Sequence, residues 1–124
     1  MRPFLFSLLL IASAAASTSY AGSFEKCQQK EKDATGLRTC IEAERNHAGN
    51  LLRDQNTDAF AAVEKIARDK GDPALVKQYR AQQAHHVRER KNTCRKQPSK
   101  NEQVACEADM DYAQIEKLKR YTEN

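Results

Sequence analysis

Apolar residues recur along most of this chain at the spacing of an amphipathic helix. From Leu37 onward they are separated mostly by three, four or seven residues, at positions 41, 48, 51, 52, 59, 60, 63 and 66. This period predicts one long helix that reaches Lys70, because Gly71 is a typical helix stop. The polar residues 56–58 are its weakest stretch, where a kink or a break is an alternative.

Two shorter helices are predicted on either side of the long one. The first runs from Phe24 to about Lys32, because residues 33–36 break the pattern. The other begins at Pro73, with Asp72 as its N-cap, and ends at Pro98. Its apolar stripe is sparse and consists of Leu75, Val76, Tyr79, Val87 and Cys94.

A last helix is predicted from Ser99 to about Tyr121. Ser99 and Glu102 have the spacing of a capping box, in which the two side chains satisfy free backbone N–H groups reciprocally. Helix-forming residues dominate the chain, and alternating runs of β-branched residues are missing. The predicted fold class is therefore all-α, a small helical bundle with one long central helix.

The N-terminus has the order of a secretory signal peptide. Met1 and Arg2 form a short positive end, an apolar run too short to span a bilayer follows, and small residues come next. Cleavage is expected before Gly22, with residues 14–16 as an earlier alternative. We therefore expect residues 1–21 to be removed and residues 22–124 to form a single periplasmic or secreted domain, without a membrane span.

Composition indicates that this domain has a thin core. Residues 22–124 contain only 14 Leu, Ile, Val and Phe side chains, below the roughly 20% at which disorder becomes an issue. Small exported domains with little apolar surface commonly add cross-links, each contributing about 2–4 kcal/mol. The four cysteines, Cys27, Cys40, Cys94 and Cys106, are therefore expected to form disulfides.

Turn signals favour local pairing of the cysteines. Thr35–Gly36 lies between Cys27 and Cys40, and Pro98–Ser99 lies between Cys94 and Cys106. A turn is needed because an unbroken helix of this length would place the two sulfurs roughly 20 Å apart. The rival pairing joins Cys27 to Cys106 and Cys40 to Cys94, and sequence alone does not decide between them. A zinc site is disfavoured because no C-x-x-C pair is present.

The cysteine frame has further features. Cys40 follows Cys27 after about a dozen residues, at the head of the long helix, and Arg90 stands four residues before Cys94. Met110 and Leu118 are apolar positions after the fourth cysteine. In these features residues 27–118 resemble the LprI-type lysozyme-inhibitor family of exported bacterial proteins.

The chain departs from the pattern of that family in two places. Along the long helix only Ala48 and Leu52 match the family's residues, and His86 stands where many members have Trp. The resemblance implies a helical module that inhibits a muramidase-like enzyme by binding to it, with no cofactor.

Two charged segments are candidate partner-binding sites. Glu107, Asp109 and Asp111 form an acidic cluster that could steer a basic lysozyme, although ordinary helix-surface charge is the alternative. A basic segment around Cys94 could dock on anionic lipid or glycan, or be a solvated helix end. It consists of Arg88, Arg90, Lys91, Arg95, Lys96 and Lys100.

The sequence contains no motif with a known catalytic mechanism, so we predict that the protein is not an enzyme. The three histidines, His47, His85 and His86, are expected at the surface or at the edge of an apolar stripe. A metal or haem site is disfavoured, because the adjacent His85 and His86 point about 100° apart on a helix. Net charge falls from +4 to a mild +3 when Arg2 is removed with the signal. Export also disfavours nucleic acid as a partner.

Three functions remain as hypotheses. The first is a protein-binding module, by resemblance an inhibitor of a muramidase-like enzyme. The second is a periplasmic structural or chaperone-like protein that holds partners along its long helix. The third is a binder of anionic envelope surfaces through the basic segment.

Overall fold

The computed structural model describes residues 22–123, which form four helices and contain no strand. These are α1 (Ser23–Lys30), α2 (Ala34–Lys70), α3 (Ala74–Cys94) and α4 (Lys100–Lys119). The predicted all-α class with one long central helix is confirmed. The predicted signal peptide lies outside the described residues.

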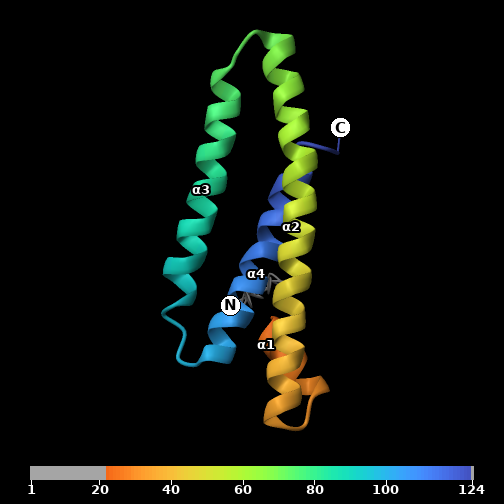
Figure 1. Ribbon diagram of the computed structural model, residues 1–124, viewed down its shortest axis with the longest axis vertical. Helices are drawn as coiled ribbons and strands as arrows, with labels where there is room; N and C mark the ends of the chain where they lie inside the picture. The colour runs from red at the N-terminus through yellow and green to blue at the C-terminus, as the bar shows by residue number, and fades with distance from the viewer. Residues whose placement is uncertain (1–21, 124) are drawn as a thin grey trace, which may run out of the picture.

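The long helix α2 organises the molecule (Figure 1). α3 runs back beside it, and α4 lies along the half of α2 nearer its beginning, where it makes the most extensive helix–helix contact of the described residues. The short α1 contacts both α2 and α4. The α1–α2 turn and the α3–α4 turn consequently lie at one end of the molecule, and the α2–α3 turn lies at the other.

α2 is continuous through its polar stretch, so the alternative of a break at 56–58 is wrong. The Thr57 hydroxyl donates to the Arg53 carbonyl, and the Asn56 side chain accepts from the Tyr79 hydroxyl. The Thr57 hydroxyl bonds to a carbonyl that the helical ladder also uses, and Asn56 bonds outside α2, and the helix continues through both residues.

α2 also begins earlier than predicted. Asp33 is its N-cap and accepts from the Gly36 N–H at 2.7 Å. The pair Thr35–Gly36 therefore lies in the first turn of α2, and the chain reverses at residues 31–33 instead. α1 accordingly ends at Lys30, two residues before the predicted end.

The start of α3 and both ends of α4 lie close to their predicted positions, whereas α3 ends at Cys94, before the predicted end at Pro98. Gly71 closes α2 with φ of 63°, and Asp72 accepts from the Ala74 N–H, so α3 begins one residue after Pro73. Ser99 caps α4 by accepting from the Glu102 N–H at 3.1 Å. The reciprocal half of the capping box is not formed, since Glu102 Oε2 is buried without a partner among the described residues.

The apolar core is divided into two clusters. The smaller one, near the α1–α2 turn, contains Cys27, Ile41 and Ala105. The larger one lies further along α2 and contains Leu52, Ala59, Val63, Tyr79, Ile115 and Leu118. Between the two clusters, fully buried Ala48 and Ala108 allow close approach of α2 and α4. Three stripe residues, Leu51, Ile66 and Val87, are exposed instead, with Val87 52% accessible.

Two local disulfides close the two turns at one end of the molecule. Cys27 is bonded to Cys40, with a Cα–Cα distance of 5.7 Å, and Cys94 to Cys106, at 5.4 Å. The favoured pairing is confirmed. Each bond joins the two helices on either side of a turn, so it fixes the geometry of that turn directly.

Candidate functional site

The three carboxylates of the predicted acidic cluster do not form a shared exposed patch. Residues two positions apart on a helix point about 200° apart, so Asp109 lies on a different face of α4 from Glu107 and Asp111. Asp109 accepts from the N–H and hydroxyl of Ser23, at 2.9 and 2.6 Å. Asp111 is completely buried. The expectation of an acidic docking patch is therefore wrong.

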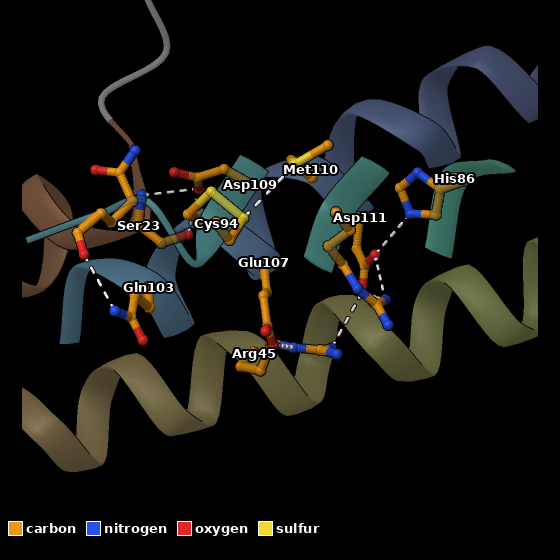
Figure 2. The surroundings of a disulfide bond; sticks show 12 residues. Ser23, Arg45, His86, Cys94, Gln103, Glu107, Asp109, Met110 and Asp111 are labelled. Carbon is orange, nitrogen blue, oxygen red and sulfur yellow. Dashed lines mark hydrogen bonds and ion pairs between the residues drawn. A yellow bond between two sulfur atoms is a disulfide. The ribbon is translucent and has the colours of Figure 1, made fainter. Parts of the chain in front are cut away.

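Asp111 is the centre of a buried ion cluster that joins three helices (Figure 2). Its Oδ2 accepts from Arg45 Nη1 of α2 at 3.1 Å, and Arg90 Nη1 of α3 donates to both of its oxygens, at 2.8 and 3.1 Å. His86 Nε2 lies 2.9 Å from Oδ1. Because an ionised carboxylate only accepts, the Nε2 atom of His86 carries the proton.

Arg90 therefore does not have the exposed position expected for the basic segment, whereas His86 lies at the edge of the apolar stripe, one of the two positions predicted for it. The His86 side chain is 10% exposed and that of Arg90 is 21% exposed. Both residues lie at helical spacing from Tyr79 and Cys94, which are buried, so the fold of α3 turns all four inward. His47 and His85 are exposed as expected.

Arg45 links the ion cluster to a second carboxylate. Its Nε donates to Glu107 at 2.9 Å, while its Nη1 reaches Asp111. Each guanidinium in the cluster is consequently held by at least one fixed carboxylate oxygen. This arrangement occupies the space between the two apolar clusters and compensates charges that would otherwise be costly to bury.

The remaining cations of the basic segment point outward. Arg88, Lys91 and Arg95 fall on one face of α3 by helical spacing, and Lys96 and Lys100 follow in the α3–α4 turn and at the start of α4. We call these five residues the turn cations. All five are exposed, and no ion pair within residues 22–123 includes them. The Cys94–Cys106 disulfide lies beside them.

An open groove runs between α2 and α3, with Asp111 of α4 at its floor. Its volume is about 600 Å³. The lining has three arginines, one carboxylate, and otherwise small, amide, hydroxyl and apolar residues. These are Arg45, Gly49, Leu52, Arg53, Asn56, Thr57, Phe60, Gln83, Arg90 and Asp111. This groove could not be predicted from the sequence, because it depends on how far α3 diverges from α2.

Hydrogen bonds and burial shift the pKa of Glu44, Tyr112 and Tyr79, which lie outside the ion cluster. The hydrogen bond from Lys26 lowers the pKa of Glu44, against the opposing effect of burial. Burial raises the pKa of Tyr112 well above its ordinary range, and its hydrogen bond to Glu44 adds to this. Burial also raises the pKa of Tyr79 to about 12.

The described residues contain no group of three or more His, Cys, Asp and Glu side chains arranged to hold a metal ion. None of their helices combines the length and apolar character needed to cross a membrane. No family model, curated protein or solved structure gives a significant match to the chain. The function is therefore argued from the arrangement of residues alone.

Proposed function

We propose that this chain is an exported protein-binding module that blocks a muramidase-like enzyme, and that the α3–α4 turn is the part that enters the enzyme's cleft. The observation that carries the proposal is the combination of a disulfide and exposed positive charge at one end of the molecule. The Cys94–Cys106 bond closes the turn, and the turn cations, all exposed, precede and follow Cys94 in the sequence.

A cross-linked turn is well suited to blocking a cleft. Binding a flexible loop costs the free energy of ordering its backbone and side chains, and fixing the loop in advance reduces this cost. Cys94 is the last residue of α3 and Cys106 lies in the second turn of α4, so between the two cysteines only residues 95–99 lie outside the helices. Ser99 adds its helix cap to the same turn.

The charge of the turn suits the chemistry of a glycoside hydrolase. Such enzymes cleave their substrate with a pair of Asp or Glu carboxylates in an open cleft. A rigid turn that carries Arg95, Lys96 and Lys100 would be attracted to those carboxylates and would occupy the substrate's position. The resemblance of the cysteine frame to LprI-type inhibitors points to the same class of partner.

A cell-wall lysis assay tests the proposal. Residues 22–124, purified with both disulfides formed, are added in increasing molar ratio to a muramidase acting on a turbid cell-wall suspension. We expect clearing of the suspension to slow as the ratio rises. Unchanged clearing at a large molar excess over several muramidases of different families would contradict the proposal.

A matched pair of variants locates the inhibitory surface. Arg95→Gln with Lys96→Gln neutralises the turn and should weaken inhibition at least about tenfold, because two charged contacts are lost. Lys70→Gln with Lys77→Gln removes the same charge near the opposite end of the molecule, where both residues are exposed. This second variant should inhibit like the original protein.

The same turn cations support a second candidate function, binding to an anionic envelope surface. Five exposed cations on one end of a protein favour attachment to acidic lipid headgroups or lipopolysaccharide. This candidate predicts retention on acidic vesicles that falls steeply as salt rises. Retention that is lost in the Arg95→Gln/Lys96→Gln variant, together with an absence of muramidase inhibition, would favour this candidate over the first.

A further inference from the structure

The groove between α2 and α3 has different chemistry at its two ends. Arg45 and Arg90, which both bond to Asp111, lie together at one end, and Phe60 lies further along α2. Arg45 and Phe60 are fifteen positions apart on α2, which corresponds to about 22 Å along the helix. An extended peptide of about six or seven residues has this length.

Hydrogen-bond donors exceed acceptors at the charged end. Arg90 uses only its Nη1 for Asp111, so its Nε and Nη2 take no acceptor among the described residues, and the same holds for Nη2 of Arg45. Asp111, the carboxylate at the floor, is already engaged by both arginines and His86. A ligand that completes this end must therefore supply acceptors, and a carboxylate matches a guanidinium best.

The two arginines are fixed before any ligand arrives. Asp111, which is fully buried, holds both of them, and Glu107 holds Arg45 a second time. Their ordering therefore adds little to the cost of binding. Gly49 keeps the approach open, because a Cβ atom at that position would lie 3.0 Å from Arg45 Nη1.

The middle of the groove favours a peptide over a lipid tail. Asn56 and Gln83 line it from α2 and α3 respectively, and neither the Asn56 Nδ2 nor the Gln83 amide has a hydrogen-bond partner within residues 22–123. Free side-chain amides pair well with peptide N–H and C=O groups, whereas an alkyl chain would leave them unsatisfied. Phe60, which is half-buried and has the Arg80 guanidinium over its ring at 5.3 Å, leaves apolar surface for one side chain, whereas Leu52 is buried in the core.

We infer that the α2–α3 groove is a second binding site, which takes an extended acidic peptide with its carboxylate between Arg45 and Arg90 and an apolar side chain against Phe60. None of the lining residues is a turn cation. The site is therefore independent of the function proposed for the α3–α4 turn, and either one can fail without the other.

The probe is a fluorescein-labelled six-residue peptide with a glutamate at one end and a phenylalanine at the other, made in both chain directions. Binding to residues 22–124 is followed by fluorescence anisotropy. We expect saturable binding in at least one direction. The counterpart with glutamine in place of glutamate should bind at least about tenfold more weakly, because the charge-assisted hydrogen bonds are lost.

The substitutions that test the groove avoid Arg45 and Arg90, because these two residues also hold Asp111 and replacing them would disturb the ion cluster. Gln83→Glu places a negative charge in the groove without touching that cluster, and it should weaken binding of the acidic peptide about tenfold or more. Ala81→Glu adds the same charge to an exposed position of α3 outside the groove. This control should bind the peptide like the original protein.

Several outcomes would overturn the inference. These are equal binding of the glutamate and glutamine peptides, no effect of Gln83→Glu, or equal weakening by Ala81→Glu. Absence of saturable binding in both chain directions would do the same. If neither peptide binds but a fatty acid such as oleate does, and Gln83→Glu weakens binding of the fatty acid, the groove takes a lipid instead.

Discussion

Arg90 of α3 donates from one guanidinium nitrogen to both carboxylate oxygens of Asp111 on α4, at 2.8 and 3.1 Å. The pair lies between the two apolar clusters, at a level where the core contains charged groups in place of large apolar side chains. It connects the two helices on either side of the α3–α4 turn, and α4 is the helix that packs most extensively on α2. The position of the proposed inhibitory turn therefore depends on a buried ion cluster.

Removing the Asp111 carboxylate should strongly destabilise the protein. Asp111→Ala leaves Arg45 and Arg90 partly buried without their shared counter-charge, and breaking a buried pair in this way costs about 3–5 kcal/mol. Glu116→Ala is the control, because it removes an exposed carboxylate of the same helix that pairs only with Lys119, and it should cost less than about 1 kcal/mol. Urea unfolding followed by circular dichroism measures both. Equal losses in the two variants would show that the ion cluster has no special role.

Each disulfide should contribute separately to stability. Each closes a short loop of the unfolded chain, so replacing either pair of cysteines by serine should cost about 2–4 kcal/mol. Total stabilities of small domains are only about 5–15 kcal/mol, so the chain without both bonds should be marginally folded. Thermal melting of the two variants, with and without a reductant, checks this. A reductant that leaves the original protein's melting temperature unchanged would refute it.

Stability at high pH should depend on Tyr79. Burial, assisted by the nearby Tyr121, raises the pKa of Tyr79 to about 12, whereas the phenol of an unfolded chain ionises near pH 10. Between about pH 10 and pH 12 the Tyr79 phenol is ionised in the unfolded chain but still protonated in the folded protein. The contribution of Tyr79 to the free energy of unfolding is therefore complete below about pH 10 and is lost as the pH rises to about 12. Tyr79→Phe removes this contribution.

The measurement is the free energy of unfolding of both proteins at pH 8 and pH 11. The variant also loses the hydrogen bond to Asn56, which lowers its stability at both pH values by a similar amount. The original protein should lose more stability than Tyr79→Phe between the two pH values. Parallel losses would mean that Tyr79 ionises as readily in the folded protein as in the unfolded chain.

The sequence predicted the helices because their signals are local. Gly71, Asp72 and Ser99 mark helix ends through hydrogen bonds to residues within a few positions, and the structure contains those bonds. The pairing of Cys94 with Cys106 followed from a turn signal between them. Asp33 was wrongly assigned to a break between helices. Aspartate is common both in such breaks and at helix N-caps, and only the hydrogen bond from the Gly36 N–H to Asp33 shows that it is a cap.

The ion cluster was missed because charged residues were assumed to be exposed. A signal was nevertheless present. Asp111 lies at helical spacing between Ala108 and Ile115, and Arg45 lies at the same spacing between Ile41 and Ala48. The four flanking apolar residues are buried. Charged residues on the apolar stripes of two different helices indicate a buried pair. The partners themselves, however, depend on which helices meet, and that information is not local.

The most direct test of the account is to open each disulfide separately and measure inhibition of muramidase-catalysed lysis at a temperature where both variants remain folded. Opening the Cys94–Cys106 bond by serine substitution frees the turn that enters the cleft, so inhibition should weaken at least about tenfold. Opening the Cys27–Cys40 bond frees the other turn and should leave inhibition unchanged. Equal inhibition by both variants and the original protein would contradict the account.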